Sequence, residues 1–457
     1  MPRRASLAAS VALVAALVAA STARAEEEPQ TTPFVRLEYE VVVERAVTRA
    51  EVQRKEPLVP RSESRWVLTL GPRTVQLETD GRRTVLDFAG GREVVVDPRT
   101  RRRRPTPLVA RVAELEMALA ERERMSAVLQ EAGISDRALV PSERSIAYGW
   151  PSVGDAATVT RVERDAEVAW SIEGEEVARC TSAEHLLDPA QRAALDRALQ
   201  RWCHLHPEVR AQIVDQGAAP AALTARWFDL GERDTATLRL VAFARDAAAP
   251  DAGDDLEREF AKGPVEQLAA GVLHAAERPD PAAVAAELDE LALTRRREGR
   301  AADALLLQFE RSMTDGHDVS SDVRTLLGTS GARERLLALM ATIQRANQEP
   351  ERGLAELDAL DRSEFTHPAI LDVFRAAALR RLGRHDAAVP ALTEALRRRP
   401  ALVAGYKDLG DVLYDMSQPD AAWLVWEVGR ALGPEHAVWR DVAGLEEQLR
   451  ATYASIL

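Results

Sequence analysis

The chain contains few residues of the types that usually perform chemistry. Among its 457 residues there are two cysteines and eight histidines, and aromatic side chains make up only 5%. It lacks a phosphate-binding P-loop, a GxGxxG dinucleotide motif, the HExxH metalloprotease motif and the GxSxG nucleophile elbow. These absences argue against nucleotide-dependent enzymes, zinc proteases and serine hydrolases. We therefore predict a protein that is not an enzyme and that needs no cofactor.

The chain also lacks an excess of positive charge. Lys and Arg together number 60 against 73 Asp and Glu, which gives a formal net charge of −13. Nucleic-acid binding needs a basic surface that displaces counterions from phosphates, so this balance argues against a nucleic-acid partner. Hydrophobic residues make up 46%, enough for packed cores, and the length predicts two or three domains. Few aromatics beside abundant Ala and Leu favour helix over sheet.

Long apolar stretches are absent except at the N-terminus. A short basic start precedes the apolar run 5–20, and a small-x-small pattern of the kind that signal peptidases cleave ends at Ala25. We predict a signal peptide over 1–25 and a flexible leader over 26–33. A retained membrane anchor is the alternative, although the run is short for a stable span. The mature chain is then expected in the periplasm or outside the cell, without a transmembrane span and compatible with envelope association.

The two cysteines, Cys180 and Cys203, have no third cysteine to compete for pairing. In an oxidising compartment such a pair is most simply a disulfide, which would stabilise the fold by about 3 kcal/mol. Two alternatives stay open. Both residues could be free buried thiols, or Cys203 could bind a metal together with His204 and His206. The compact CxxC spacing that is typical of zinc sites is absent.

Residues 34–246 have the pattern of an α+β domain. Val35, Leu37, Tyr39 and Val41 alternate with polar neighbours, as in a half-buried strand. Further short apolar runs, separated by Gly, Pro and Asp turns, predict an antiparallel sheet with packed helices. We expect strands at 65–70, 74–78, 84–88, 93–96, 145–148, 157–162, 167–172, 176–180, 223–230 and 235–243, and helices at 108–132 and 188–203.

Residues 247–256 form an acidic stretch with Pro and Gly, where we place a linker between domains. Beyond it the hydrophobic period is helical, and an offset of 34 residues matches positions in kind. Small residues match small ones, large apolar residues match large apolar ones, and Pro matches Pro. The matched pairs are Ala376 and Gly410, Leu379 and Leu413, Ala388 and Ala422, Leu392 and Trp426, Ala395 and Gly429, and Pro400 and Pro434.

This pattern resembles the tetratricopeptide repeat, most clearly at Leu409-Gly410, Ala422, Trp426 and Pro434. The resemblance implies an all-α solenoid of helical hairpins, in which small residues allow close helix crossing and Pro ends the second helix. We expect repeats over 335–436, with the best units at 369–402 and 403–436, degenerate repeats over 257–334 and a capping helix over 437–457.

In that family the first helix of each hairpin recognises the partner. The resemblance therefore implies a groove for a protein or peptide segment, in which Arg380, Arg381 and Lys407 would bond acidic groups. Ordinary surface residues without a ligand are the alternative. The implied groove residues are Val373, Ala377, Arg380, Arg381, Lys407, Asp411, Tyr414 and Asp415.

A second resemblance concerns the N-terminal part. Residues 85–88 followed by 93–97 are similar to consecutive strands of the lipoprotein-carrier type of half-barrel, which implies a concave sheet for an apolar ligand. The run Arg101–Arg104 is either a contact for anionic polymers or lipid head groups, or a solvated hairpin edge. The leading hypothesis is an exported, non-enzymatic scaffold or adaptor. A lipid or small-ligand carrier and a metal-dependent envelope enzyme are the alternatives.

Overall fold

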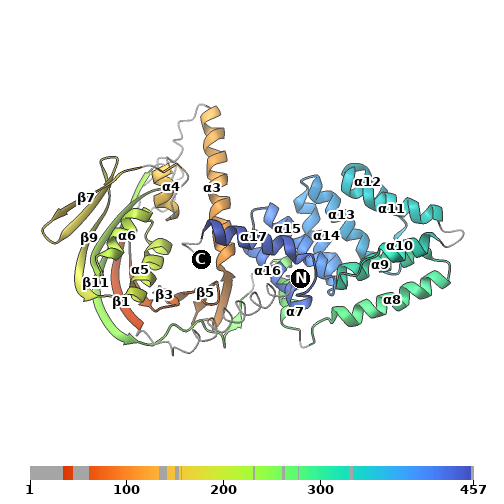
Figure 1. The fold of residues 1–457 in the computed structure, drawn as a ribbon, viewed down its shortest axis with the longest axis horizontal. Helices are drawn as coiled ribbons and strands as arrows, with labels where there is room; N and C mark the ends of the chain where they lie inside the picture. Colours follow the sequence, from red (N-terminus) through yellow and green to blue (C-terminus); the bar gives the residue numbers. More distant parts are fainter. Residues whose placement is uncertain are drawn as a thin grey trace, which may run out of the picture. The chain divides into compact units, whose positions relative to one another are not determined.

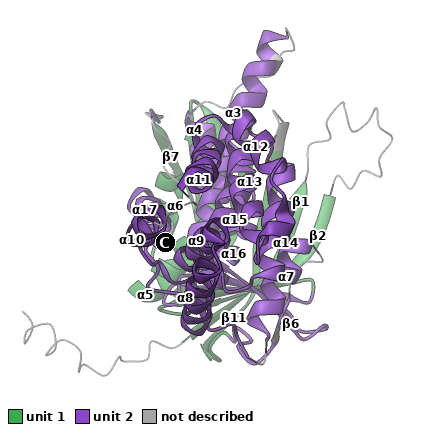
Figure 2. Ribbon diagram, turned by 90° about the vertical axis from the view of Figure 1, so that its right-hand side faces the viewer, with its two compact units in different colours: residues 1–80, 156–250 green, residues 81–155, 251–457 purple. Residues whose placement is uncertain are grey.

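The computed structural model forms two compact units, each assembled from two separate stretches of chain. It describes residues 34–44, 61–132, 141–149, 154–155, 157–229, 232–259, 263–275, 277–328 and 333–453. Unit 1 contains residues 1–80 and 156–250, and unit 2 contains residues 81–155 and 251–457 (Figure 2). One junction falls inside the expected linker 247–256, whereas the grouping of 81–155 with the helical part was not expected. The predicted signal peptide and leader lie outside the described residues.

Unit 1 is built on antiparallel strands in the order β3-β2-β1-β11-β10-β9-β8-β7. Strand β1 lies inside the sheet, because it pairs with β2 on one side and with β11 on the other. The strands are β1 (Phe34–Glu44), β2 (Arg61–Leu70), β3 (Thr74–Thr79), β7 (Val159–Arg164), β8 (Glu167–Ile172), β9 (Glu175–Leu186), β10 (Ala218–Asp229) and β11 (Glu232–Ala247).

The alternating pattern of β1 decides which face of this sheet is buried. Val35, Leu37, Tyr39 and Val41 are each at most 1% exposed. The residues between them are more exposed, because successive side chains of a strand point to opposite faces. The sequence-based prediction for this strand is confirmed, and its apolar side forms the core of unit 1.

Two helices lie against the buried face of the unit 1 sheet (Figure 1). They are α5 (Pro189–Trp202), which was predicted, and α6 (Pro207–Asp215), which was not. Helix α5 begins where the sequence indicates, because Asp188 and Gln191 form a reciprocal capping box ahead of it. The inner face of this sheet is therefore covered by the chain itself.

The predicted strand at 145–148 is wrong. These residues are the second half of helix α4 (Pro141–Tyr148) in unit 2. Pro suits the first turn of a helix, and Glu143 lies where the helix dipole favours an acid. A four-residue apolar and polar alternation does not distinguish a strand from one face of a short helix, which explains the error.

The strands of unit 2 form a small sheet beside a long helix. β4 (Arg82–Asp87) and β5 (Arg92–Asp97) pair antiparallel, as do β5 and β6 (Arg102–Pro107), while β12 (Glu257–Arg258) runs parallel to β6. Helix α3 (Leu108–Glu131) follows β6 directly, close to its predicted bounds. Strand β6 was missed, since its two prolines and three arginines argue against a strand.

The rest of unit 2 is helical and shares one continuous apolar core. Neighbouring helices pair as hairpins: α8 with α9, α11 with α12, α13 with α14 and α15 with α16. The α+β class, with strands in the N-terminal part and helices in the C-terminal part, is confirmed. The helices are α7 (Pro264–Leu273), α8 (Pro281–Arg297), α9 (Ala301–Asp315), α10 (Ser320–Leu327), α11 (Arg333–Gln348), α12 (Pro350–Asp358), α13 (Ala369–Arg381), α14 (His385–Arg398), α15 (Val403–Asp415), α16 (Pro419–Leu432) and α17 (Trp439–Thr452).

Helix α9 departs from a simple stack of hairpins. Its side chains and backbone form hydrogen bonds with three loops, which lead into α13, α15 and α17. The bonds join Asp303 to Thr366, Glu310 to His367 and Arg399, and Ser312 to His436. Apart from β12, the described elements of region 257–334 are helices, as expected. Helix α9 runs along the edge of the later hairpins and connects them through these hydrogen bonds. Among the described helices, none combines the length and apolarity that a bilayer span requires.

Candidate binding surface on the helical hairpins

Two glycines of the repeat pattern lie where helices cross closely. A Cβ at Gly410 would lie 2.1 Å from Nε1 of Trp426, and a Cβ at Gly429 would lie 2.6 Å from Cη2 of Trp439. The Trp426 indole also donates to the carbonyl oxygen of Lys407 at 3.2 Å. The small and large positions that the 34-residue offset matched are therefore contact positions between helices.

Three of the eight predicted groove residues contribute to packing. Val373 is 1% exposed and belongs to the core. Ala377 is half-buried on the same helix. The ring of Tyr414 lies 5.8 Å from that of Trp423 and 5.9 Å from that of Trp426, measured between centroids. These three residues shape the surface and present little polar chemistry to a partner.

Four other predicted groove residues bond to one another. Arg380 of α13 donates through Nη1 to Asp411 at 2.8 Å and through Nε to Asp415 at 2.6 Å. Lys407 donates through Nζ to Asp411 at 2.7 Å. We call this set the ionic ladder, because it joins the first helices of two successive hairpins. Burial lowers the pKa of Arg380, but its bonds and charges with Asp415 and Asp411 outweigh burial and raise the pKa overall.

Three charged residues beside the ladder are less engaged. The side chain of Arg381 is exposed and, among the described residues, has no hydrogen bond or ion pair. The carboxylate of Asp408 is half-buried and likewise has no hydrogen bond within the described part of the chain. Asp441 has an 85% exposed side chain, 3.7 Å from Nζ of Lys407. The sequence analysis missed Asp408 and Asp441, although Asp441 follows Lys407 by the repeat offset of 34 residues.

The electrostatic balance of this surface is acidic. Burial, the largest cause, and the charge of Asp411 raise the pKa of Asp408 to about 6, against the opposing effect of Lys407 and Arg380. The two cations of the ladder are already neutralised by aspartates. We define the first-helix face as Arg380, Arg381, Lys407, Asp408, Asp411, Asp415 and Asp441. Its available groups are mainly acceptors, so it suits a partner that donates hydrogen bonds from cationic side chains.

The predicted disulfide is absent, because Cys180 and Cys203 are both free and buried. Burial raises the pKa of each thiol to about 12, so both are protonated at neutral pH. Burial also raises the pKa of Tyr39, and both cysteines add to that rise, which places the two thiols beside the same phenol. Within the described residues, no group of three or more His, Cys, Asp or Glu side chains is placed to hold a metal. His206 instead caps α6 by accepting from the backbone N–H of Glu208 at 3.3 Å.

Comparison with known proteins adds little to this geometry. No protein-family model and no curated protein matches the chain. A solved structure titled "Lipid-protein interactions in lipovitellin" is similar at 12% sequence identity with a TM-score of 0.17. The match covers 92% of this chain and 58% of the lipovitellin chain. This chain therefore spans less than two thirds of the length of the lipovitellin chain. A TM-score this low does not establish a common fold.

Proposed function

We infer that the chain is an exported, non-catalytic adaptor that binds a protein segment rich in Lys or Arg through the first-helix face of unit 2. The observation that carries this proposal is the ionic ladder. Arg380 and Lys407 already hold Asp411 and Asp415, while Asp408 and Asp441 keep acceptor oxygens available. An acidic segment, expected from the sequence, would have to compete with those aspartates for the same cations.

The resemblance to the tetratricopeptide repeat supports the use of this face. Proteins of that family bind partners with the first helix of each hairpin, and the face joins residues of α13, α15 and α17. The close crossings at Gly410 and Gly429 keep these helices in register. A rigid, preorganised surface loses little conformational entropy on binding, which suits an adaptor.

The carrier hypothesis for the N-terminal sheet has weaker support. Leu195, Leu199 and Ile213 of α5 and α6 are at most 2% exposed, so the sheet face that would hold an apolar ligand is filled by the chain's own side chains. A ligand there would have to displace both helices. We therefore do not propose a carrier function.

The test uses the full mature chain and two labelled peptides at about 0.15 M salt, where long-range charge effects are screened. One peptide alternates Lys with Gly, and the other has Glu in place of Lys. We expect the Lys peptide to bind more tightly. The double variant Asp408→Asn/Asp441→Asn should lower its affinity about five- to thirtyfold, because two solvent-accessible charge contacts contribute about 0.5–1 kcal/mol each.

The matched control is Asp386→Asn/Glu435→Gln, which removes two exposed acids with the same change of net charge. Its affinity should equal that of the wild type. Arg381→Ala should bind the Lys peptide equally well or slightly better. Tighter binding of the Glu peptide, or equal losses in both double variants, would show that this face is not the site.

A further inference from the structure

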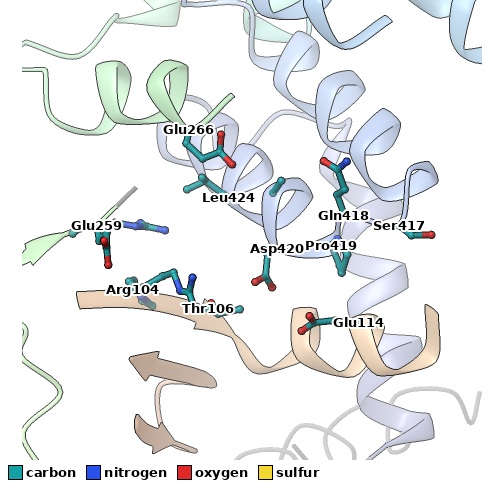
Figure 3. Close-up of a pocket in the computed structure, with 13 residues that line it drawn as sticks. Arg104, Thr106, Glu114, Glu259, Glu266, Ser417, Gln418, Pro419, Asp420 and Leu424 are labelled. Atoms are coloured by element: carbon teal, nitrogen blue, oxygen red, sulfur yellow. The ribbon is translucent and has the colours of Figure 1, made fainter. Parts of the chain in front are cut away.

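A cleft of about 340 Å³ lies within unit 2, and none of the residues that line it belongs to the ionic ladder. Residues of β6, the start of α3, the chain before α7 and the start of α16 line it (Figure 3). This volume is within the range of pockets that hold small organic groups. Figure 3 shows Glu114 and Asp420 on one side of the space and Glu259 on the opposite side, with Leu424 between them and Glu266 above.

One wall of the cleft carries more negative than positive charge. The guanidinium of Arg111 stands behind it, with Nη1 2.6 Å from Glu114 and 3.1 Å from Asp420, and with Nε 3.4 Å from Glu93. Three carboxylates thus share one arginine. Burial, followed by the charges of Glu114 and Glu93, raises the pKa of Asp420 although Arg111 and Arg104 oppose the rise. At Asp420, burial and the neighbouring acids thus outweigh the two arginines.

The opposite wall adds two carboxylates that no described residue pairs with. Glu259 is exposed and Glu266 is half-buried, and neither carboxylate has a hydrogen bond or ion pair with a described residue. Arg258 directly precedes Glu259 in sequence, but it binds Glu427 through both terminal nitrogens, at 2.7 and 2.8 Å. The remaining cation on the lining is Arg104, which is exposed.

The position of Arg104 also bears on the arginine run 101–104. Arg103 points to Asp254, with which it forms an ion pair, while Arg104 reaches the cleft. Within this run, Arg103 is thus used in an internal ion pair, and Arg104 belongs to a cleft lining that is rich in carboxylates. A binding site for an anion would place that anion against Glu114, Glu259, and Asp420, so the charge balance argues against one at this cleft.

We propose that this cleft binds an arginine side chain of a partner polypeptide. The aliphatic stem would lie against Leu424 and Pro105, and the planar guanidinium would donate to carboxylates on both walls. Arginine suits two facing walls better than lysine, because its guanidinium presents donors along two edges. The site goes beyond the first-helix face and does not depend on it.

The experiment is a calorimetric titration of the full mature chain with a blocked Gly-Arg-Gly peptide and with the same peptide carrying citrulline, the neutral isostere of arginine. We expect the arginine peptide to bind about tenfold more tightly. The variant Glu259→Gln/Glu266→Gln should weaken it about fivefold, since both side chains keep their shape and lose only charge. The variant Asp408→Asn/Asp441→Asn should bind it unchanged, which separates this site from the first-helix face.

Equal affinities for the arginine and citrulline peptides would overturn the proposal. So would an unchanged affinity in Glu259→Gln/Glu266→Gln, provided that this variant melts at the wild-type temperature. A loss of binding only in Asp408→Asn/Asp441→Asn would assign the arginine to the first-helix face instead. A Lys-containing peptide that equals the arginine peptide would keep the charge preference but reject the two-wall geometry.

Discussion

The inner face of the unit 1 sheet and the first-helix face of unit 2 differ in whether their polar side chains have hydrogen-bond partners within the chain. In unit 1 the buried hydroxyl of Tyr39 donates to the carbonyl of Pro220 at 3.1 Å, and apolar side chains fill the space around it. In unit 2 the carboxylate of Asp408 has no hydrogen bond with the described residues, and the side chains of Asp441 and Arg381 face solvent. Polar groups that a fold leaves available are where a partner gains the most, so recognition is expected on unit 2.

The largest effect is expected from a substitution that disrupts the helix packing beneath the first-helix face of unit 2. Gly410→Val would place a Cβ 2.1 Å from the indole nitrogen of Trp426, and the helix backbone would have to move. We expect a loss of about 3 kcal/mol in the free energy of unfolding, measured by chemical denaturation of the full chain. Gly444→Ala is the control, because its Cβ would meet no atom within 4 Å. Equal stability of Gly410→Val and the wild type would contradict the close crossing of α15 and α16.

A slightly smaller effect probes the sealed face of unit 1. Leu195 of α5 is 1% exposed, and Leu195→Ala should destabilise the fold by about 2–4 kcal/mol because it leaves a cavity beneath the sheet. Hydrogen exchange in β1 and β2 should accelerate. Leu186→Ala, at a side chain that is 66% exposed, should change little. If Leu195→Ala were nearly neutral, α5 would be loosely attached and a ligand-carrying role for this face would regain support.

The sequence correctly predicted those helices and strands that are marked by a capping motif or by apolar alternation among neighbouring residues. The capping box at Asp188 marks the start of α5, and the alternation from Val35 marks β1. Features that depend on distant partners were not predicted, namely the strand β6 and the placement of α9. Strand β6 forms against its Pro content because β5 supplies a partner, and α9 lies along the hairpin edge because buried Glu310 meets His367 and Arg399 there.

The sequence placed the residues of the proposed face on particular helices but did not predict how their charges pair. The repeat offset put Arg380 and Lys407 on the first helices of two successive hairpins, α13 and α15, since spacing decides which side of a helix a residue occupies. It could not show that Arg380 reaches Asp411 and Asp415 on the next hairpin, because a tertiary contact has no local signal. The change from a cationic groove to an acidic face follows from that pairing alone.

A smaller expected effect is the dependence of stability on pH that Asp408 of the first-helix face contributes. The pKa of Asp408 is about 6 in the folded chain, above its ordinary value, so folding favours the protonated form. Its contribution to stability is complete at low pH and is lost as pH rises through about 4 to 6. Asp408→Asn should therefore be more stable than the wild type by about 1 kcal/mol at neutral pH and equal to it near pH 4. Thermal unfolding at several pH values measures this, and Glu435→Gln should follow the wild type throughout.

The smallest expected effect is an absence of reaction. Cys180 and Cys203 are buried free thiols with pKa values near 12, so iodoacetamide at pH about 8 should leave both unmodified in the folded chain. After unfolding without a reductant, both should gain the label, which mass spectrometry counts. A mass two hydrogens lower and no labelling until reduction would instead reveal the disulfide predicted from the sequence. In that case a disulfide between Cys180 and Cys203 would stabilise unit 1 in addition to the packing of its core.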